Sequence, residues 1–414
     1  MKVGWRIIAI LFLAWMMSYF ERAMISTALP FIGHDFGLTA TVMGFVSSAF
    51  FIGYALMQIP GGIIADRFGS RKTIAIGILV WSVFSALTGT AGGLATLIWI
   101  RILFGLGEGV FPPGSWKMLS NWFKPATRAT ANAVMLCSNL VGPALAPLVF
   151  APLMGAVGWR HSFWILAIPG LAVAVLAWWY LRDRPRDHPK ITPAEIEELA
   201  SEEDSRPVTD GGLRASLKQM LRTGVLWKLF FIWMTWDVTW WGFLSWLPTY
   251  LYSARGLTLT KTGLMTALPY VVGLAGMLLA GYLADKLKSR KAVMIPVLIG
   301  NAVFMTMMAF ATSATSVVIA LIGIGFFLPA MYGPFWSLPM DLLPSKVMGY
   351  AAGFINFGGQ IAGFTAPIVI GALVQGSGHY VAGFVFMAVS AVVSLVLTVS
   401  LKEKRKMETA VAVA

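Results

Sequence analysis

The chain has few charged residues and almost no cysteine. Of its 414 residues only 12% are charged, and a single Cys is present. A soluble globular domain carries roughly twice that charged fraction, so the composition excludes one. One cysteine cannot form an intrachain disulfide, and the four His fall in predicted loops, so no metal site is expected. The sequence also has no nucleophile–base constellation, and we expect neither an enzyme nor a cofactor.

Long apolar runs take the place of the missing charges, and 58% of the residues are hydrophobic. A run of about twenty apolar residues is long enough to cross a bilayer as an α-helix. The first run is too long for a cleaved signal peptide and lacks a small-residue cleavage site, so we expect it to stay as a span. The twelve predicted spans are 5–29, 40–64, 73–91, 94–117, 129–155, 160–182, 225–253, 262–284, 291–311, 315–341, 346–374 and 379–401. The predicted fold class is therefore an all-α membrane protein.

The net charge of +13 is distributed unevenly about these spans. Of the 31 Lys and Arg, 25 fall on one side of the membrane, three on the other and three within spans. An excess of Lys and Arg marks the cytoplasmic side. We therefore predict an integral protein of a bacterial-type inner membrane with both termini in the cytoplasm. The lipid bilayer explains the basic balance, and no nucleic-acid partner is expected.

One long polar segment divides the chain. Residues 183–224 form a predicted cytoplasmic linker between an N-terminal half, 1–182, and a C-terminal half, 225–401, and a cytoplasmic tail follows at 402–414. Within TPAEIEELASEED, Thr192 and Glu195 have the spacing of a capping box, which predicts a short surface helix.

The two halves contain a repeated loop. Residues 62–72 read GIIADRFGSRK and residues 281–291 read GYLADKLKSRK, a shift of 219 positions. Each copy follows the second span of its half. Parallel repeats of this kind are found in transporters that bind their substrate near the midplane, between the halves.

The loop G-x-x-x-D-R-x-G-x-R-K resembles the signature loop of the major facilitator superfamily. The resemblance covers nearly the whole chain and implies two pseudo-symmetric six-helix bundles, alternating access and a monomer. One departure is Lys288, which stands where the first copy has Gly69. Asp66 sits at a helix end, where it can pair with cations and latch one conformation. The predicted gating residues are Gly62, Asp66, Arg67, Gly69, Arg71, Lys72 and Asp285.

Five ionisable residues fall at bilayer depth, where charge is costly and marks functional sites. They are Glu21 and Arg22 in the first span, Arg101 and Glu108 in the fourth, and Asp237 in the seventh. Consecutive helix residues point about 100° apart, so Glu21 and Arg22 cannot pair well with each other. Fixed interhelical ion pairs are one interpretation. The functional one is that a buried Arg receives a carboxylate and a neighbouring Glu carries a proton.

Four further motifs narrow the resemblance. They are SYFER in the first span, RILFGLGEGVFPP at 101–113, WLPTYL at 246–251 and GPFWSLPMDLLP at 333–344. Together they resemble the anion:cation symporters, which include sugar-acid permeases, sialin and the vesicular glutamate transporters. The resemblance implies a secondary active transporter that moves a small organic anion with protons.

Carried over position by position, the resemblance also implies roles for individual residues. The implied substrate-binding residues are Tyr19, Arg22, Tyr54, Trp336 and Asn356. The implied proton-coupling residues are Glu21, which stands where sugar-acid relatives often have Asp, and the pair Arg101 and Glu108. The roles of two further residues stay open. Asp237 is either a third titratable site or a residue that faces a water-filled vestibule. Gln360 is either a substrate ligand or an interhelical hydrogen-bonding group. Hydroxyl groups are scarce around Trp336, which favours a smaller or more apolar carboxylate than a sugar acid.

Two other functions compete with this interpretation. A drug/proton antiporter of the same fold usually shows Gly-Pro-x-x-Gly-Gly in the fifth span. Here Gly142 and Pro143 are followed by Ala-Leu-Ala-Pro, and two buried Arg would repel a cationic drug. A non-transporting membrane sensor is the other alternative, but the sequence shows no signalling tail or soluble domain for it.

Overall fold

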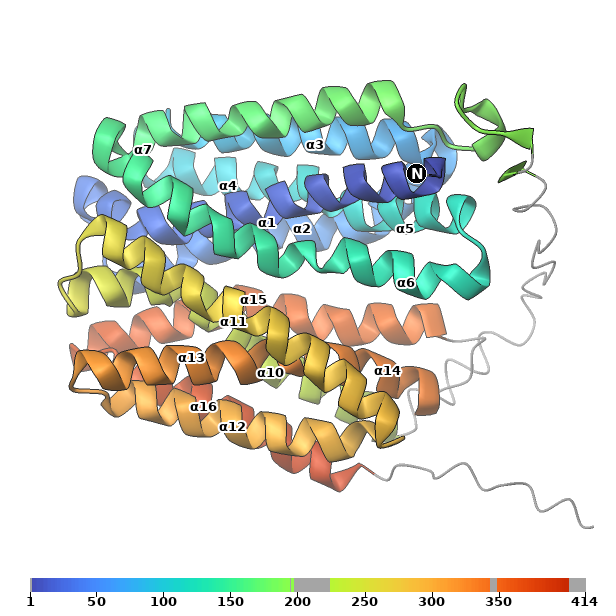
Figure 1. Ribbon diagram of the computed structural model, residues 1–414. Helices are drawn as coiled ribbons and strands as arrows, with labels where there is room; N and C mark the ends of the chain where they lie inside the picture. Colours follow the sequence, from blue (N-terminus) through green and yellow to red (C-terminus); the bar gives the residue numbers. More distant parts are fainter. Residues whose placement is uncertain (1, 194, 197–223, 343–347, 402–414) are drawn as a thin grey trace, which may run out of the picture. The chain divides into compact units, whose positions relative to one another are not determined.

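The structure is a computed structural model that describes residues 2–193, 195–196, 224–342 and 348–401 (Figure 1). Helices make up nearly all of these ranges, and no strand occurs within them. Most of the predicted linker and the tail at 402–414 lie outside the described residues. The first helices are α1 (Val3–Phe36), α2 (Ala40–Phe68), α3 (Ser70–Thr88), α4 (Leu94–Gly109), α5 (Phe111–Trp122), α6 (Pro125–Leu136) and α7 (Ser138–Tyr180). The later ones are α10 (Gly224–Thr249), α11 (Leu259–Lys286), α12 (Arg290–Phe310), α13 (Ala314–Ala330), α14 (Tyr332–Leu342), α15 (Met348–Ser377) and α16 (Val381–Ser400).

These helices supply the twelve predicted spans. Within the described residues, ten helical stretches are long and apolar enough to cross a membrane. One of them, Thr130–Tyr180, contains two spans, because Gly158 has a φ of 78° and breaks α7 there. The tryptophan-rich α10 is the twelfth. The all-α membrane fold is therefore confirmed.

Two spans are divided by short breaks next to prolines. The fourth span consists of α4 and α5, which meet at Val110 before Pro112 and Pro113. The tenth consists of α13 and α14, which meet at Met331 after Pro329. Proline removes a backbone donor and clashes with the preceding turn, so a helix bends or ends near it. The break at Val110 comes two residues after Glu108.

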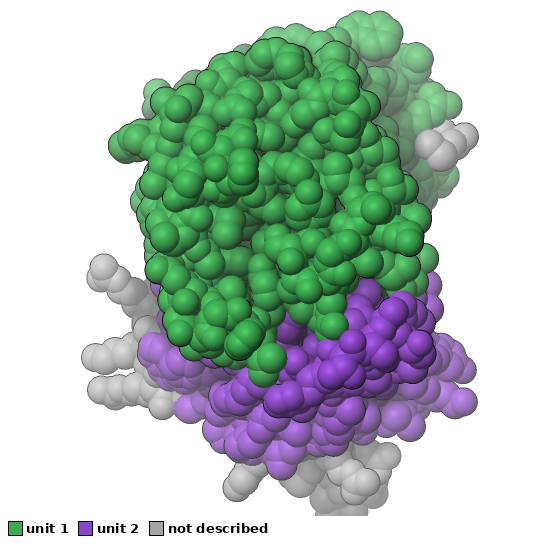
Figure 2. Space-filling view, turned by 90° about the vertical axis from the view of Figure 1, so that its left-hand side faces the viewer, with its two compact units in different colours: residues 1–206, 241–271, 363–383 green, residues 207–240, 272–362, 384–414 purple. Residues whose placement is uncertain are grey.

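By internal contacts the chain falls into two units, coloured separately in Figure 2. The first unit contains residues 1–206 together with 241–271 and 363–383, and the second contains the remainder. Within the first unit α1 packs on α7, and α3 packs on both α4 and α7. The units cut across the two predicted six-span halves, which stay a prediction about domain organisation.

The first unit is held together at the end of α2 that lies away from the signature loop. Here the hydroxyl of Thr41 donates to the side-chain oxygen of Gln375 at 2.6 Å. The indole of Trp246 donates to the carbonyl oxygen of Pro367 at 3.0 Å. Gly44 lies so close to the same carbonyl that any added Cβ would overlap it. Segments of α10 and α15 are therefore packed tightly against α2 at this end.

The start of the linker is docked on the N-terminus. Thr192 and Glu195 form the predicted capping box: the Glu195 amide donates to the Thr192 hydroxyl at 3.3 Å, and the Thr192 amide donates to the Glu195 carboxylate at 3.1 Å. The other Glu195 oxygen accepts from the amide of Val3 at 3.3 Å. These donors hold the pKa of Glu195 below its usual range. The rest of the predicted surface helix lies outside the described residues.

Candidate functional site

An ion pair between α1 and α4 lies at the centre of the buried charges. The Nε of Arg22 donates to Oε1 of Glu108 at 2.8 Å, and a terminal nitrogen of the same guanidinium contacts that oxygen as well. The hydroxyl of Ser18, one turn before Arg22, donates to it too. The side chains of Arg22 and Glu108 are 6% and 2% exposed. The other oxygen of Glu108 has no hydrogen-bonding partner among the described residues.

Aromatic rings surround the guanidinium of Arg22. Its Cζ lies 4.4 Å from the ring centre of Phe50, 4.7 Å from Tyr19, 4.9 Å from Tyr54 and 5.4 Å from Trp241. The ring of Tyr19 stacks on that of Trp241 at an interplanar angle of 15°. Aromatic faces attract a cation and keep water away from it. This aromatic frame gives Arg22 a low-dielectric setting.

Arg101 lies on α4 but is not the ion-pair partner of Glu108 in this structure. It is 2% exposed, its Cζ lies 4.8 Å from the ring centre of Phe104, and its Nε makes no hydrogen bond to a described residue. Seven residues of helix separate Arg101 from Glu108 by about 10 Å along the axis. Glu108 instead meets Arg22, which reaches it from the facing helix. Arg101 still acts electrostatically on Glu108, Arg22 and Glu21.

Glu21 faces a different part of the bundle from Arg22. Its side chain is fully buried beside Ser85 of α3. A Cβ added to Gly170 of α7 would lie 2.8 Å from Oε1 of Glu21 and would overlap the hydroxyl of Ser82. Neither carboxylate oxygen makes a hydrogen bond to a described residue. A buried carboxylate without a hydrogen-bonding partner is costly, and such groups inside spans mark functional sites.

The candidate residues of the second unit gather near an aromatic cluster. Asp237 on α10 is 5% exposed, and its carboxylate lies against the backbone of Gly359 on α15. One turn earlier, the ring of Trp233 packs 5.0 Å from that of Trp336 on α14. Asn356 and Gln360 are half-buried on α15, and the Gln360 carbonyl oxygen has no partner among the described residues.

The first signature loop is organised around Asp66 and Arg71. Asp66 forms an ion pair of 2.7 Å with Lys117 of α5. The Arg71 amide donates to Asp183 at 2.8 Å, and its side chain donates to the Trp178 carbonyl oxygen at 2.8 Å. Gly69 has a φ of 89° and lies against Asp183, so a side chain there would be both strained and obstructed. Gly62 is half-buried and Arg67 is exposed, stacked on Phe68.

The second copy uses its charges differently. Arg290 pairs with Asp285 of its own loop at 2.5 Å and with Asp341 of α14 at 3.4 Å. Lys291 donates to the carbonyl oxygens of Val399 and Leu401 at the end of α16, at 2.5 and 2.7 Å.

Three contributors to the first site were missed by sequence reasoning: Ser18, Phe50 and Trp241. Phe50 is one of many apolar residues of its span, and nothing in the sequence distinguishes it. Ser18 stands four residues before Arg22, a spacing that places both on one helix face, so it could have been found. Trp241 lies within a run of tryptophans, WMTWDVTWW, in which no spacing distinguishes one ring from another. Only the packing shows that Trp241 reaches Arg22.

Comparisons with known proteins agree with the helical architecture. The family described as the Major Facilitator Superfamily matches residues 11–367. A probable sulfoacetate transporter of Cupriavidus necator is 33% identical over 388 residues, covering 92% of this chain and 89% of that protein. A hexuronate transporter of Bacillus subtilis is 32% identical over 389 residues, covering 91% and 90%. The inward-open structure of the E. coli xylose transporter XylE has a TM-score of 0.78 at 16% identity, covering 98% of both chains, and so shares the fold.

Proposed function

Because the chain belongs to the Major Facilitator Superfamily and is an integral membrane transporter, not an enzyme, we propose that it moves small organic anions across the membrane together with protons, by alternating access. The observation that carries the proposal is the buried Arg22–Glu108 pair inside its aromatic frame. The relatives named for sulfoacetate and hexuronate support an acidic substrate.

Substrate binding begins at Arg22. A guanidinium presents parallel donors that match a carboxylate or sulfonate, and the match is strongest away from water. An incoming anion therefore competes with Glu108 for Arg22, with Tyr19 and Tyr54 as flanking hydroxyl groups. The aromatic walls favour a small or partly apolar acid over one with many hydroxyl groups.

Proton coupling follows from the same exchange. When the substrate takes Arg22, Glu108 is left as a buried carboxylate without its counter-charge. A buried charge that has lost its partner is strongly destabilised, so Glu108 then binds a proton. When the substrate leaves, Arg22 returns to Glu108 and the proton is released. Binding of anion and proton is thus linked without a further conformational element.

Glu21 provides a second proton site. Its carboxylate has no hydrogen bond among the described residues and is influenced by the charges of Arg101 and Glu108. Arg101 is placed to transmit the state of Glu108 to Glu21 through its field. Protons on Glu108 and Glu21 moving with a monovalent anion would carry one net positive charge, and a third proton on Asp237 would raise it to two.

The second unit contributes Trp336 and Asn356 as substrate contacts, and Gln360 as a further hydrogen-bonding group. Asp237 is a third proton site in this proposal. It makes no hydrogen bond or ion pair with a described residue, and the buried residues described for this unit include no Lys, Arg or His.

The test is uptake into proteoliposomes with an inward proton gradient, with sulfoacetate, D-glucuronate and a cationic drug as probes. We expect uptake of at least one anion, and Arg22→Gln should reduce it at least about thirtyfold, the effect of breaking a buried charge pair. Arg22→Lys, which keeps the charge, tests whether the loss reflects folding, and Arg160→Gln serves as a control outside the cluster. Uptake of the drug alone, driven only when the proton gradient is reversed to point outward, would favour an antiporter. Ligand binding without any uptake would favour a sensor. Either result would overturn the proposal.

A further inference from the structure

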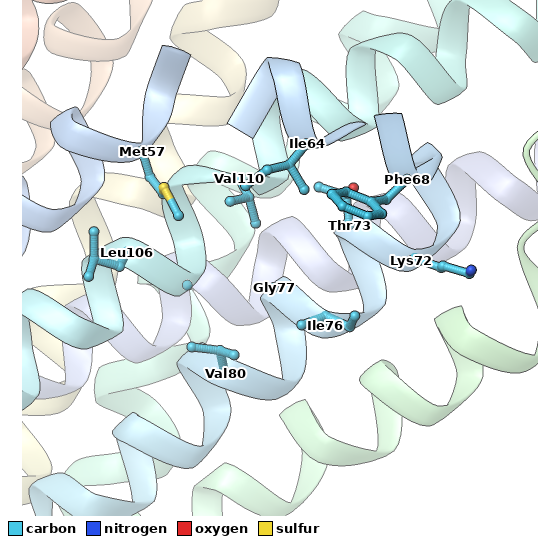
Figure 3. Close-up of a pocket in the computed structure, with 11 residues that line it drawn as sticks. Met57, Ile64, Phe68, Lys72, Thr73, Ile76, Gly77, Val80, Leu106 and Val110 are labelled. Carbon is cyan, nitrogen blue, oxygen red and sulfur yellow. The ribbon is translucent and has the colours of Figure 1, made fainter. Parts of the chain in front are cut away.

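An apolar groove lies between α2, α3 and α4, and none of the buried charges lines it (Figure 3). It encloses about 320 Å³. Its lining residues are Met57, Ile64, Phe68, Lys72, Thr73, Ile76, Gly77, Val80, Leu106, Gly107 and Val110. Phe68 and Ile76 are about half exposed, so the groove is open at the surface of the membrane-spanning helices. In a membrane-spanning protein, an apolar surface of this kind faces the hydrocarbon region of the bilayer.

The groove exists because α3 and α4 meet at glycines. A Cβ added to Gly77 would lie 2.7 Å from a methyl of Val110, and one added to Gly107 would lie 2.7 Å from a methyl of Val80. The two backbones touch here, and the larger side chains on either side form walls. The hydroxyl of Thr73 donates to the Gly69 carbonyl oxygen within its own helix, so it offers the groove no free donor.

Lys72 is the one cation that lines the groove, and it stands at the end next to the signature loop. Its side chain points outward from the other lining residues, with the amine at its far end (Figure 3). The amine makes no hydrogen bond or ion pair with any residue that the structure describes. Arg67 adds a second positive charge close by, with its Cζ 5.5 Å from the ring centre of Phe68. Long basic side chains extend from apolar surface toward the headgroup region in this way.

Comparison with the second copy of the loop shows why the Lys72 amine has no hydrogen-bonding partner among the described residues. Its counterpart Lys291 donates to two carbonyl oxygens at the end of α16. At the end of α7 such carbonyl oxygens are already occupied: Arg71 takes that of Trp178, and Arg182 takes those of Trp179 and Leu181. The first loop therefore has a lysine with no carbonyl to bind.

We propose that this groove binds one anionic phospholipid, whose acyl chain fills the apolar walls and whose phosphate pairs with Lys72. From Lys72 to Val80 the groove runs about 12 Å along α3, so an acyl chain can extend from headgroup level into the hydrocarbon region. Basic pockets between transmembrane helices on the cytoplasmic side suit anionic headgroups. The bound lipid would bridge α2 and α3 on either side of the signature loop.

Lipid retention by the purified full-length protein tests the proposal. Native mass spectrometry would compare binding of phosphatidylglycerol with phosphatidylcholine of the same chain length. We expect about fivefold preference for the anionic lipid, the effect of one basic residue near the surface. Lys72→Gln should remove the preference. Lys190→Gln, which removes an exposed positive charge outside the groove, should keep it.

A second variant and a free anion separate the alternatives. Ile76→Trp should fill the groove and reduce retention of both lipids, because the acyl chain loses its place. Equal binding of the two lipids by the wild type would overturn the proposal, as would an unchanged preference in Lys72→Gln. Thermal stabilisation by inorganic phosphate as large as that by phosphatidylglycerol would identify an ion site and equally reject the lipid.

Discussion

The two halves of this transporter share a loop but differ in their buried charge. Among the described residues, the first half buries Glu21, Arg22, Arg101 and Glu108 within its spans, and the second half buries only Asp237. The two copies of the loop also differ in how their aspartate is paired. Asp66 pairs across helices with Lys117, whereas Asp285 pairs with Arg290 of its own loop.

One pair of aligned positions explains why the two loop aspartates are paired differently. The shift of 219 that aligns the loops also aligns Lys117 with Trp336, so the second half has an aromatic ring where the first has an interhelical cation. Among the described residues, the first half thus buries two cations and two acids within its spans, and the second half buries one acid beside aromatic side chains.

The largest effect that separates the halves is expected from Glu108→Gln. The amide cannot carry a proton, and it no longer competes as an anion for Arg22. Uptake driven by the proton gradient should fall to the passive level, while counterflow exchange of the anion continues. Anion binding, which in the wild type strengthens as the pH falls, should also depend less on pH in this variant. Proteoliposome uptake and exchange at pH 5.5 and 7.5 measure both, and full gradient-driven accumulation by the variant would contradict the assignment.

Asp237→Asn should have a smaller effect on transport than Glu108→Gln. It should change only the number of protons moved with each anion. If Asp237 carries a proton, the variant moves one proton fewer per D-glucuronate, and its reversal potential shifts accordingly. Glu21→Gln is the matched variant in the first half and should cause the same shift. An unchanged reversal potential in Asp237→Asn would assign a structural role to this carboxylate. Absence of net current with this monovalent anion in the wild type would rule out two or more coupled protons.

Removing the loop carboxylates should affect the halves unequally. Asp66→Asn breaks the only ion pair that the described residues give to Asp66, and since that side chain is 77% exposed the pair is a weak one. We expect up to about fivefold change in transport rate, because a surface pair contributes at most about 1 kcal/mol. Asp285→Asn should change the rate less, since Arg290 keeps Asp341. A larger effect of Asp285→Asn would reverse this ranking.

The smallest expected effect concerns the backbone at the loop. Lys288 has a φ of 50° where the first copy has Gly69 at 89°. Lys288→Gly should raise stability by up to about 1 kcal/mol, because glycine adopts a left-handed conformation without strain. Gly69→Ala should lower it by about 1–3 kcal/mol, since its backbone angles are nearly restricted to glycine. Thermal unfolding in detergent compares the two, and equal shifts of the same sign would show that the loops are not distinguished by backbone strain.

Much of the architecture could be predicted from local patterns. Apolar runs identify the spans, and the loop GIIADRFGSRK with its copy identifies the superfamily. The charges at bilayer depth also stand out, because few residues of that kind occur in spans. The breaks at Val110 and Met331 were not predicted, since a proline next to a span signals a bend without fixing its position.

What the sequence determined by itself is the number of spans, the repeat and the short list of buried ionisable residues, because hydrophobicity and residue type are local properties. The tertiary structure decided which of them meet. Helical spacing shows that Glu21 and Arg22 point apart, but not that Glu21 faces Ser82 and Gly170 or that Arg22 reaches Glu108. Helical spacing likewise does not show that Lys291, and not Lys72, donates to carbonyl oxygens at the end of a helix. Pairing across helices depends on how two faces are packed together, and that is a property of the assembled bundle.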